Sequence, residues 1–259
     1  MVVDAGIERA AARGYARAPS AYEQGRPAYP AEAVICLQRE LGLEPGRVVL
    51  DLAAGTGKLT ARLVGTGATV IAVEPVDEMR AALERKLPGV DARSSTAEAV
   101  ALPDASVHAV TVGQAFHWFR GAEALSEIHR VLRPGGRLGL VWNLRDETVP
   151  WVAGLTGIME PHRGSAPRAA SGAWREAFER TALFGPLEEA TFRHVHRLTP
   201  EGVVARVASV SFVAALGEEE RAAVLRSVRE VLARDPDTRG RAEVELPYRT
   251  DVYWCARRG

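Results

Sequence analysis

An acidic residue followed by a glycine-containing turn is the segment of this sequence best suited to bind a ligand. Residues 51–60 read D-L-A-A-G-T-G-K-L-T and overlap the apolar run R-V-V-L-D-L at residues 47–52. Gly55 and Gly57 allow a ligand to approach the backbone closely, and the expected helix after them offers unpaired N–H groups at its start. A strand, a turn of small residues and a helix in this order point to nucleotide or nucleoside binding.

Two common nucleotide-binding motifs do not fit this turn. A P-loop, G-x-x-x-x-G-K-[ST], would require glycine at position 52 and serine or threonine at position 59, where the chain has Leu52 and Leu59. The dinucleotide motif G-x-G-x-x-G would require a glycine where the chain has Lys58. A nucleotide-dependent oxidoreductase is therefore disfavoured. A non-catalytic cofactor-binding domain is a second alternative, and of the two the oxidoreductase is the less favoured.

The turn resembles motif I of the class I S-adenosylmethionine-dependent methyltransferases, in which an acid precedes a G-x-G-x-G turn. Ala53 stands where that family usually has its first glycine. Val73-Glu74-Pro75 resembles the end of the second strand, where an acid binds both ribose hydroxyls, as one carboxylate can. Glu74 follows Asp51 by 23 residues, about the length of one βαβ step.

The resemblance extends over roughly residues 15–143. It includes Thr96-Ala97-Glu98, which resembles the adenine loop, Q-A-F-H-W-F at residues 114–119, and L-R-P-G-G-R-L-G-L at residues 132–140. The Gln-x-x-His-Trp-Phe element, together with Tyr22 and Arg26-Pro27, is similar to a small-molecule subgroup that includes the trans-aconitate methyltransferases.

The resemblance implies a role for each candidate residue. Bound S-adenosylmethionine would contact Asp51, Ala53, Gly55, Gly57, Glu74, Pro75, Met79, Thr96, Ala97, Gln114 and Arg26, and the product would be S-adenosylhomocysteine. His117 is the catalytic candidate, and Tyr22, Trp118, Trp142 and Asn143 are expected around the substrate. No metal is expected, because these motifs hold no set of histidine, cysteine or aspartate residues at ligand spacing.

The acceptor atom remains open between a carboxylate and a hydroxyl oxygen. A hydroxyl would need a base such as His117 to remove its proton, whereas a carboxylate is already ionised at pH 7. The narrower likeness favours an orienting role for His117. Specificity is expected to come from residues 15–30 and from residues 145–171.

Four short apolar runs, at residues 47–52, 69–73, 107–113 and 136–142, predict strands covered on both faces. Helical spacing of leucines between them predicts βαβ units. With the resemblance, the expected fold is α/β: a doubly wound, Rossmann-like, seven-stranded, mostly parallel sheet with helices on both faces, an N-terminal arm and a helical lid insertion.

Three segments are expected within this fold. Residues 1–46 would form an arm and a helix that belong to the lid, and residues 47–143 the cofactor-binding core. Residues 144–259 would supply the lid insertion and the last strands, with a helix at residues 218–234. Pro247, inside the apolar segment at residues 243–256, predicts a bend or an edge strand.

Composition limits the other possibilities. Lysine and arginine number 33, as do aspartate and glutamate, so a protein that coats nucleic acid is disfavoured. Two cysteines are too few for a disulfide scaffold, and neither a signal-peptide pattern nor a membrane-spanning apolar run is present. We expect a cytoplasmic monomer or homodimer that acts on a small molecule, without a nucleic-acid or membrane partner.

Overall fold

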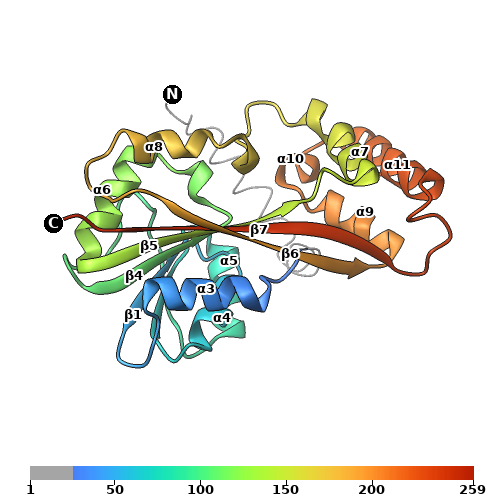
Figure 1. Cartoon of the computed structure of the whole chain (residues 1–259). Coiled ribbons are helices and arrows are strands. Elements are labelled where there is room, and N and C mark those ends of the chain that lie inside the picture. Colours follow the sequence, from blue (N-terminus) through green and yellow to red (C-terminus); the bar gives the residue numbers. More distant parts are fainter. Residues whose placement is uncertain (1–25) are drawn as a thin grey trace.

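Seven strands form one sheet in the order β3-β2-β1-β4-β5-β7-β6 in the computed structural model, which describes residues 26–259 (Figure 1). The first five pair in parallel, and β7 runs antiparallel to both β5 and β6. The predicted mostly parallel, seven-stranded α/β fold is confirmed. The strands are β1 (Val48–Leu52), β2 (Thr69–Val73), β3 (Asp91–Arg93), β4 (Val107–Gly113), β5 (Leu132–Arg145), β6 (Glu188–Leu198) and β7 (Val244–Ala256).

Helices cover both faces of this sheet. On one face, α3 (Ala31–Leu41) and α4 (Lys58–Val64) pack leucines such as Leu37 and Leu63 against Val49. On the other face, α6 (Gly121–Val131) and α8 (Glu176–Glu179) lie over Leu50 and its neighbours. Neighbouring residues of a strand point to opposite faces, so the continuous apolar run of β1 serves both cores. Helix α5 (Asp77–Lys86) follows β2.

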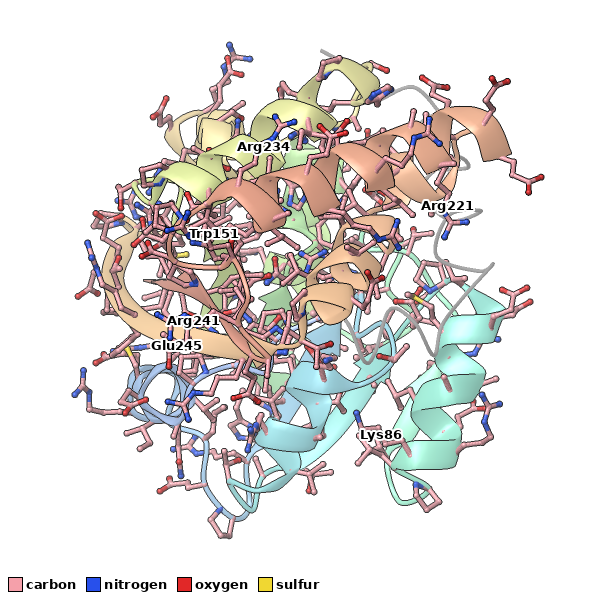
Figure 2. The ribbon with its side chains drawn as sticks, turned by 90° about the vertical axis from the view of Figure 1, so that its right-hand side faces the viewer. Lys86, Trp151, Arg221, Arg234, Arg241 and Glu245 are labelled. Carbon is pink, nitrogen blue, oxygen red and sulfur yellow. The ribbon has the colours of Figure 1, made fainter. Side chains whose placement is uncertain are left out.

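A cap with its own apolar core lies beyond the parallel strands, at the far ends of β6 and β7 (Figure 1). It consists of α7 (Pro150–Met159), α9 (Pro200–Ala208), α10 (Ser211–Ala214) and α11 (Glu218–Arg234). Figure 2 shows Arg221 and Arg234 near the two ends of α11, where both are exposed, whereas Trp151 of α7 lies toward the interior and is buried. Short 3-10 turns occupy Phe116–Trp118, Glu160–His162, Ala169–Ser171 and Ala173–Arg175.

Three features differ from the sequence-based expectation. Helix α3 covers the sheet rather than the cap, because its apolar side packs on the strands. The cap takes three helices from residues 200–234 in addition to α7. Strand β7 lies between β5 and β6 although it contains Pro247. The carbonyl of Pro247 accepts a hydrogen bond from Asp146 N, just after the last residue of β5 that pairs with β7. In an antiparallel pair the N–H and C=O of one residue face the same neighbouring strand. The N–H that Pro247 lacks would therefore face β5, so the hydrogen bonds between β7 and β6 are unaffected.

No helix between residues 26 and 259 combines the length and apolar character that crossing a bilayer requires.

Candidate functional site

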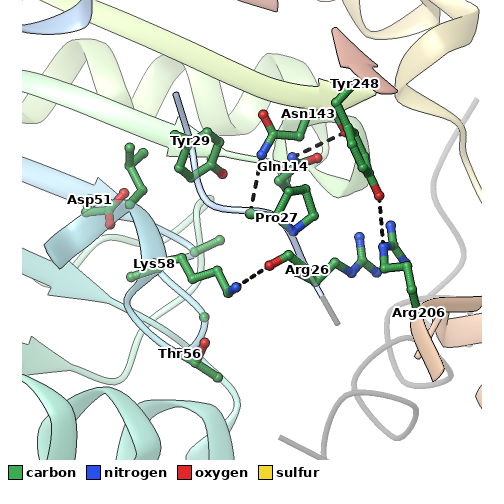
Figure 3. A pocket seen from close by; sticks show the side chains of 15 residues that line it. Arg26, Pro27, Tyr29, Asp51, Thr56, Lys58, Gln114, Asn143, Arg206 and Tyr248 are labelled. Atoms are coloured by element: carbon green, nitrogen blue, oxygen red, sulfur yellow. Dashed lines mark hydrogen bonds between the residues drawn. The ribbon is translucent and has the colours of Figure 1, made fainter. Parts of the chain in front are cut away.

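Two adjoining cavities lie at the carboxyl ends of the parallel strands, where ligands bind in open α/β sheets. The first, of about 50 Å³, is bounded by the loop after β1, by Gln114 and by residues 26–29 (Figure 3). The second, of about 460 Å³, extends toward the cap and is lined by His117 and Trp118. Five residues line both cavities: Arg26, Gln114, Asn143, Arg206 and Tyr248.

The loop after β1 has a backbone that alternates into the left-handed region. Ala53, Gly55 and Gly57 have φ of 56°, 59° and 80°. At Gly57 a side chain would also be crowded, because an added Cβ would lie 3.0 Å from Cγ of Leu83, which would have to shift. These are the positions of the glycines in the motif that the sequence resembles, so Ala53 adopts a conformation that costs a non-glycine residue about 1–2 kcal/mol.

Asp51 is buried beneath this loop and lines the smaller cavity. Its carboxylate accepts hydrogen bonds from the hydroxyls of Thr60 (2.6 Å) and Thr111 (3.1 Å). Burial raises the pKa of Asp51 to about 6, against the opposing effect of these two hydroxyls. Asp51 therefore links β1, α4 and β4 below the expected ligand.

Glu74, at the end of β2, ties the neighbouring strand to the loop. Its Oε2 accepts from Gly55 N and its Oε1 from Val76 N, each at 2.8 Å. The residue is only 5% exposed, and burial raises the pKa of Glu74. A carboxylate has about four lone-pair positions, so each oxygen retains one for a ribose hydroxyl. The residues present thus fit the expected nucleoside, although Glu74 does not line either cavity.

Residues 26–29 close the smaller cavity from above. Lys58 donates to the carbonyl of Arg26, and Asn143 Nδ2 donates to the carbonyl of Ala28 at 3.2 Å (Figure 3). Tyr29 packs against Gly113, where an added Cβ would lie 2.7 Å from the Tyr29 hydroxyl. This segment is therefore held to the carboxyl ends of β4 and β5.

Gln114 and Asn143 are the two side-chain amides that line both cavities. Gln114 has a φ of 63° and donates from Nε2 to the carbonyl of Asn143 at 3.5 Å. The side-chain oxygen of Asn143 accepts from the Thr250 hydroxyl at 2.6 Å. Strained backbone at Ala53 and Gln114, on the same cavity, is typical of functional sites.

His117 lies in the 3-10 turn after β4 and lines the larger cavity. The indole N–H of Trp142 donates to its Nδ1 at 3.2 Å. Burial, reinforced by the charges of Arg26 and Arg163, lowers the pKa of His117 to about 3. A neutral imidazole whose Nδ1 accepts carries its proton on Nε2, so His117 presents an N–H donor.

The expectation that Trp142 contacts the substrate is corrected by the structure. The side chain is 1% exposed and lines neither cavity. It packs against Trp174 at 4.5 Å between ring centroids and against Tyr253. Trp142 reaches the cavity only through its hydrogen bond to His117, whereas Trp118 does line it.

The remaining predicted residues lie around the loop without lining the two cavities. Pro75 and Thr96 are exposed, while Met79 and Ala97 are buried. Met79 contacts the loop, since its sulfur would lie 3.9 Å from a Cβ added at Gly55. Tyr22 lies outside the described residues, so its expected substrate contact stays a prediction.

Arg206 and Tyr248, which line both cavities, were not anticipated from the sequence, whereas Tyr29 and Arg145 lie in the two segments expected to determine specificity. Arg206 and Tyr248 have no motif around them and reach the site from α9 and β7. No group of three or more histidine, cysteine, aspartate or glutamate side chains within residues 26–259 could hold a metal ion.

Comparison with known proteins identifies the family. A family model described as a methyltransferase domain matches residues 50–140. An uncharacterised methyltransferase of Mycobacterium tuberculosis is 42% identical over 236 residues, which cover 91% of this chain and 92% of that protein. An uncharacterised methyltransferase-like protein of Schizosaccharomyces pombe is 38% identical over 233 residues, covering 90% and 91%.

The fold is also found in solved structures. A putative methyltransferase from an antibiotic biosynthesis pathway of Anabaena variabilis superposes with a TM-score of 0.64 at 23% identity, over 88% of this chain and 98% of that one. Together with the loop after β1, these relatives set aside the oxidoreductase and the non-catalytic alternative. The chain belongs to the class I S-adenosylmethionine-dependent methyltransferases and is an enzyme that uses S-adenosylmethionine as its cofactor.

Proposed function

We propose that this enzyme methylates an oxygen atom of a small molecule that binds in the larger cavity. A volume of about 460 Å³ falls within the range of small-molecule sites. The cavity adjoins the loop of the expected cofactor site and shares Gln114 and Asn143 with it. This adjacency is the observation that carries the proposal.

Each part of the site has a separate task in this proposal. When bound, S-adenosylmethionine supplies an electrophilic methyl group on a sulfonium centre. Glu74 would hold the ribose hydroxyls, and residues 26–29 would keep water from the methyl group. The Nε2–H of His117 would hold a lone pair of the acceptor oxygen. Bringing the reactants together in this way lowers the barrier without a covalent enzyme intermediate.

The state of His117 favours an acceptor that needs no base. Its pKa is lowered to about 3, and its Nδ1 is already engaged by Trp142. A group so poorly basic at neutral pH is ill suited to remove a hydroxyl proton. Between the two expected oxygens, a carboxylate is therefore favoured over a hydroxyl. The likeness to the trans-aconitate subgroup, the monomeric or homodimeric state and the cytoplasmic location stay predictions.

The test uses the full chain, S-adenosylmethionine with a labelled methyl group, and a cell extract separated into small molecules, protein and nucleic acid. We expect label in the small-molecule fraction, in a product that is heavier by CH₂ and releases labelled methanol on mild alkaline hydrolysis. Label in protein or nucleic acid would overturn the small-molecule acceptor. A methylated nitrogen or carbon would overturn the oxygen.

A further inference from the structure

The larger cavity has an excess of arginine side chains. Six arginines line it, namely Arg26, Arg145, Arg163, Arg168, Arg206 and Arg249, against two acidic residues, Asp146 and Glu147. The net charge of the chain is zero, so this is a local concentration of positive charge. A cavity of one sign attracts ligands of the opposite sign.

The outer arginines already have carboxylate partners. Arg168 donates to both oxygens of Glu147 at 2.7 Å. Arg163 pairs with Glu160 at 2.7 Å, and Arg249 pairs with Asp251 at 3.0 Å. The two acids of the cavity thus have other partners, since Glu147 accepts from Arg168, and Asp146 accepts from Thr148 and lies 3.7 Å from Arg193.

Arg145, at the end of β5, is different. Within residues 26–259 it makes no ion pair, and its Nη2 donates to the Thr156 hydroxyl at 3.4 Å, a long hydrogen bond. Its Nε is fully enclosed and has no hydrogen-bond partner among the described residues. A buried donor without a partner is costly, and a guanidinium with unused N–H groups can bind a carboxylate in a fork.

Arg206 adds a second positive charge beside Arg145. Arg206 is 6% exposed and donates from Nε to the Tyr248 hydroxyl at 3.2 Å. Figure 3 shows the side chain of Arg26 extending toward that of Arg206. Burial and the neighbouring charge of Arg206 lower the pKa of Arg145 to about 10. An anion between these groups would offset the repulsion and supply the missing acceptor.

We propose that Arg145, with Arg206 beside it, binds a carboxylate of the methyl acceptor, so that the substrate of this enzyme is a small organic anion. The inference rests on the proposed function, in which a carboxylate is already the favoured acceptor, and it adds the residues that bind a carboxylate of the substrate. Trp118 and Phe212 line the same cavity, so the organic part of the anion would lie against aromatic rings.

Calorimetry on the full chain loaded with S-adenosylhomocysteine tests this inference. The probes are succinate, citrate and benzoate, each with its amide analogue, and inorganic phosphate. We expect at least one carboxylate to bind and its amide not to bind. Arg145→Gln should weaken that carboxylate about 10- to 100-fold, the effect of a lost charged hydrogen-bond pair. Arg145→Lys, which keeps the charge but not the fork, should give an intermediate loss.

Arg180→Gln is the matched control, because Arg180 is 74% exposed and pairs with Glu176 on α8, away from both cavities. The inference is overturned if no carboxylate binds, if the amides bind equally well, if phosphate alone binds, or if Arg145→Gln and Arg180→Gln behave alike. Methyl transfer to a neutral molecule would also overturn it while the proposed function survives. Carboxylate binding at Arg145 without methyl transfer to any small molecule would instead contradict the proposed function.

Discussion

The two cavities of this enzyme are built in different ways. The smaller one is lined by the loop at residues 51–57, to which Glu74 at the end of the next strand is hydrogen-bonded, so a short stretch of sequence determines it. The larger one combines Arg145 of β5, residues 163–170 and Arg206 of α9. The difference indicates that the cofactor side depends on local backbone conformation, whereas the acceptor side depends on how the cap packs on the sheet.

Glu74→Ala should produce the largest effect and should be confined to the cofactor side. The variant loses the acceptor of the two ribose hydroxyls, and each charged hydrogen bond contributes about 1.5–3 kcal/mol. We expect S-adenosylhomocysteine to bind at least about 100-fold more weakly, as measured by calorimetry. Carboxylate binding in the larger cavity should change much less.

Glu127→Ala is the control for this experiment. Glu127 also accepts a backbone N–H, from Val100 at 3.0 Å, and pairs with Arg130, but it lies outside both cavities. It should lose stability without losing cofactor affinity. If Glu74→Ala binds the cofactor like the unchanged protein, the position assigned to the ribose is wrong.

His117→Ala should act mainly on the acceptor side. Because His117 presents a donor rather than a base, we expect KM for the acceptor to rise about 10-fold and kcat to fall less. Steady-state kinetics at saturating S-adenosylmethionine measures both. Trp142→Phe separates the roles further, since it frees Nδ1 while leaving the imidazole in place. A fall in kcat of about 100-fold or more in His117→Ala, at unchanged KM, would indicate a base instead.

Asn143→Ala should weaken binding in both cavities, because Asn143 lines both of them and holds residues 26–29. The loss of the side-chain hydrogen bonds to Pro27, Ala28 and Thr250 should weaken cofactor and carboxylate binding together, each by about 5- to 10-fold. Thr250→Val is the matched variant, since it removes the bond to the side-chain oxygen of Asn143 and the 3.2 Å contact with His194 Nδ1, but leaves the bond from Asn143 to Ala28. If Thr250→Val reproduces the whole loss, the contact with Ala28 has no role in binding.

The sequence predicts the parallel core and the bounds of α11, at residues 218–234, but not how the cap packs on the sheet, for a physical reason. Strands β2 and β4 coincide with the predicted runs at residues 69–73 and 107–113, because strands buried on both faces are continuously apolar. Strand β3 has only the three residues D-A-R at the sheet edge and carries no such signal. Strand β5 extends to Arg145, beyond the predicted Trp142, because its pairing with β7 continues to that residue.

The residues of the site likewise fall into those that the sequence predicts and those that it does not. Asp51, Gly55 and Gln114 are brought to the smaller cavity as the motif predicts, because they follow strands whose order the βαβ pattern determines. Arg206 and Tyr248 could not be predicted, since the packing of the cap brings α9 to the site and the pairing of β7 with β5 places Tyr248 opposite Arg145. The burial that places Trp142 behind His117 is likewise a property of the whole aromatic cluster.

Lowering the pH should decrease the free energy of unfolding through His117. The pKa of His117 is about 3 in the folded protein and about 6.5 in an unfolded chain. As the pH falls below 6.5, the unfolded chain gains a proton that the folded protein takes up only near pH 3. Stability from this group is therefore lost on acidification, by at most about 1.4 kcal/mol per pH unit.

Asp51 has the opposite effect on stability, so a variant is needed to isolate the contribution of His117. The pKa of Asp51 is raised to about 6, so between its unfolded value and pH 6 the folded protein binds more protons and gains stability on acidification. Urea unfolding at pH 7 and pH 5 should therefore show a smaller acid loss in His117→Ala than in the unchanged protein. An equal loss in both would show that His117 is not kept neutral by the fold.

Ala53→Gly should have the smallest effect, and it tests whether local backbone conformation determines the cofactor side. Relief of the left-handed strain at φ 56° favours the variant by about 1–2 kcal/mol, and the greater freedom of glycine in the unfolded chain offsets about 0.4–1 kcal/mol of this. We expect a net gain of up to about 1.6 kcal/mol in the free energy of urea unfolding, and we expect cofactor affinity to stay within about twofold. Ala54→Gly, at the neighbouring residue without positive φ, should instead lose about 0.4–1 kcal/mol. If both variants lose stability equally, the left-handed conformation at Ala53 is not what makes a glycine favourable at this position of the motif.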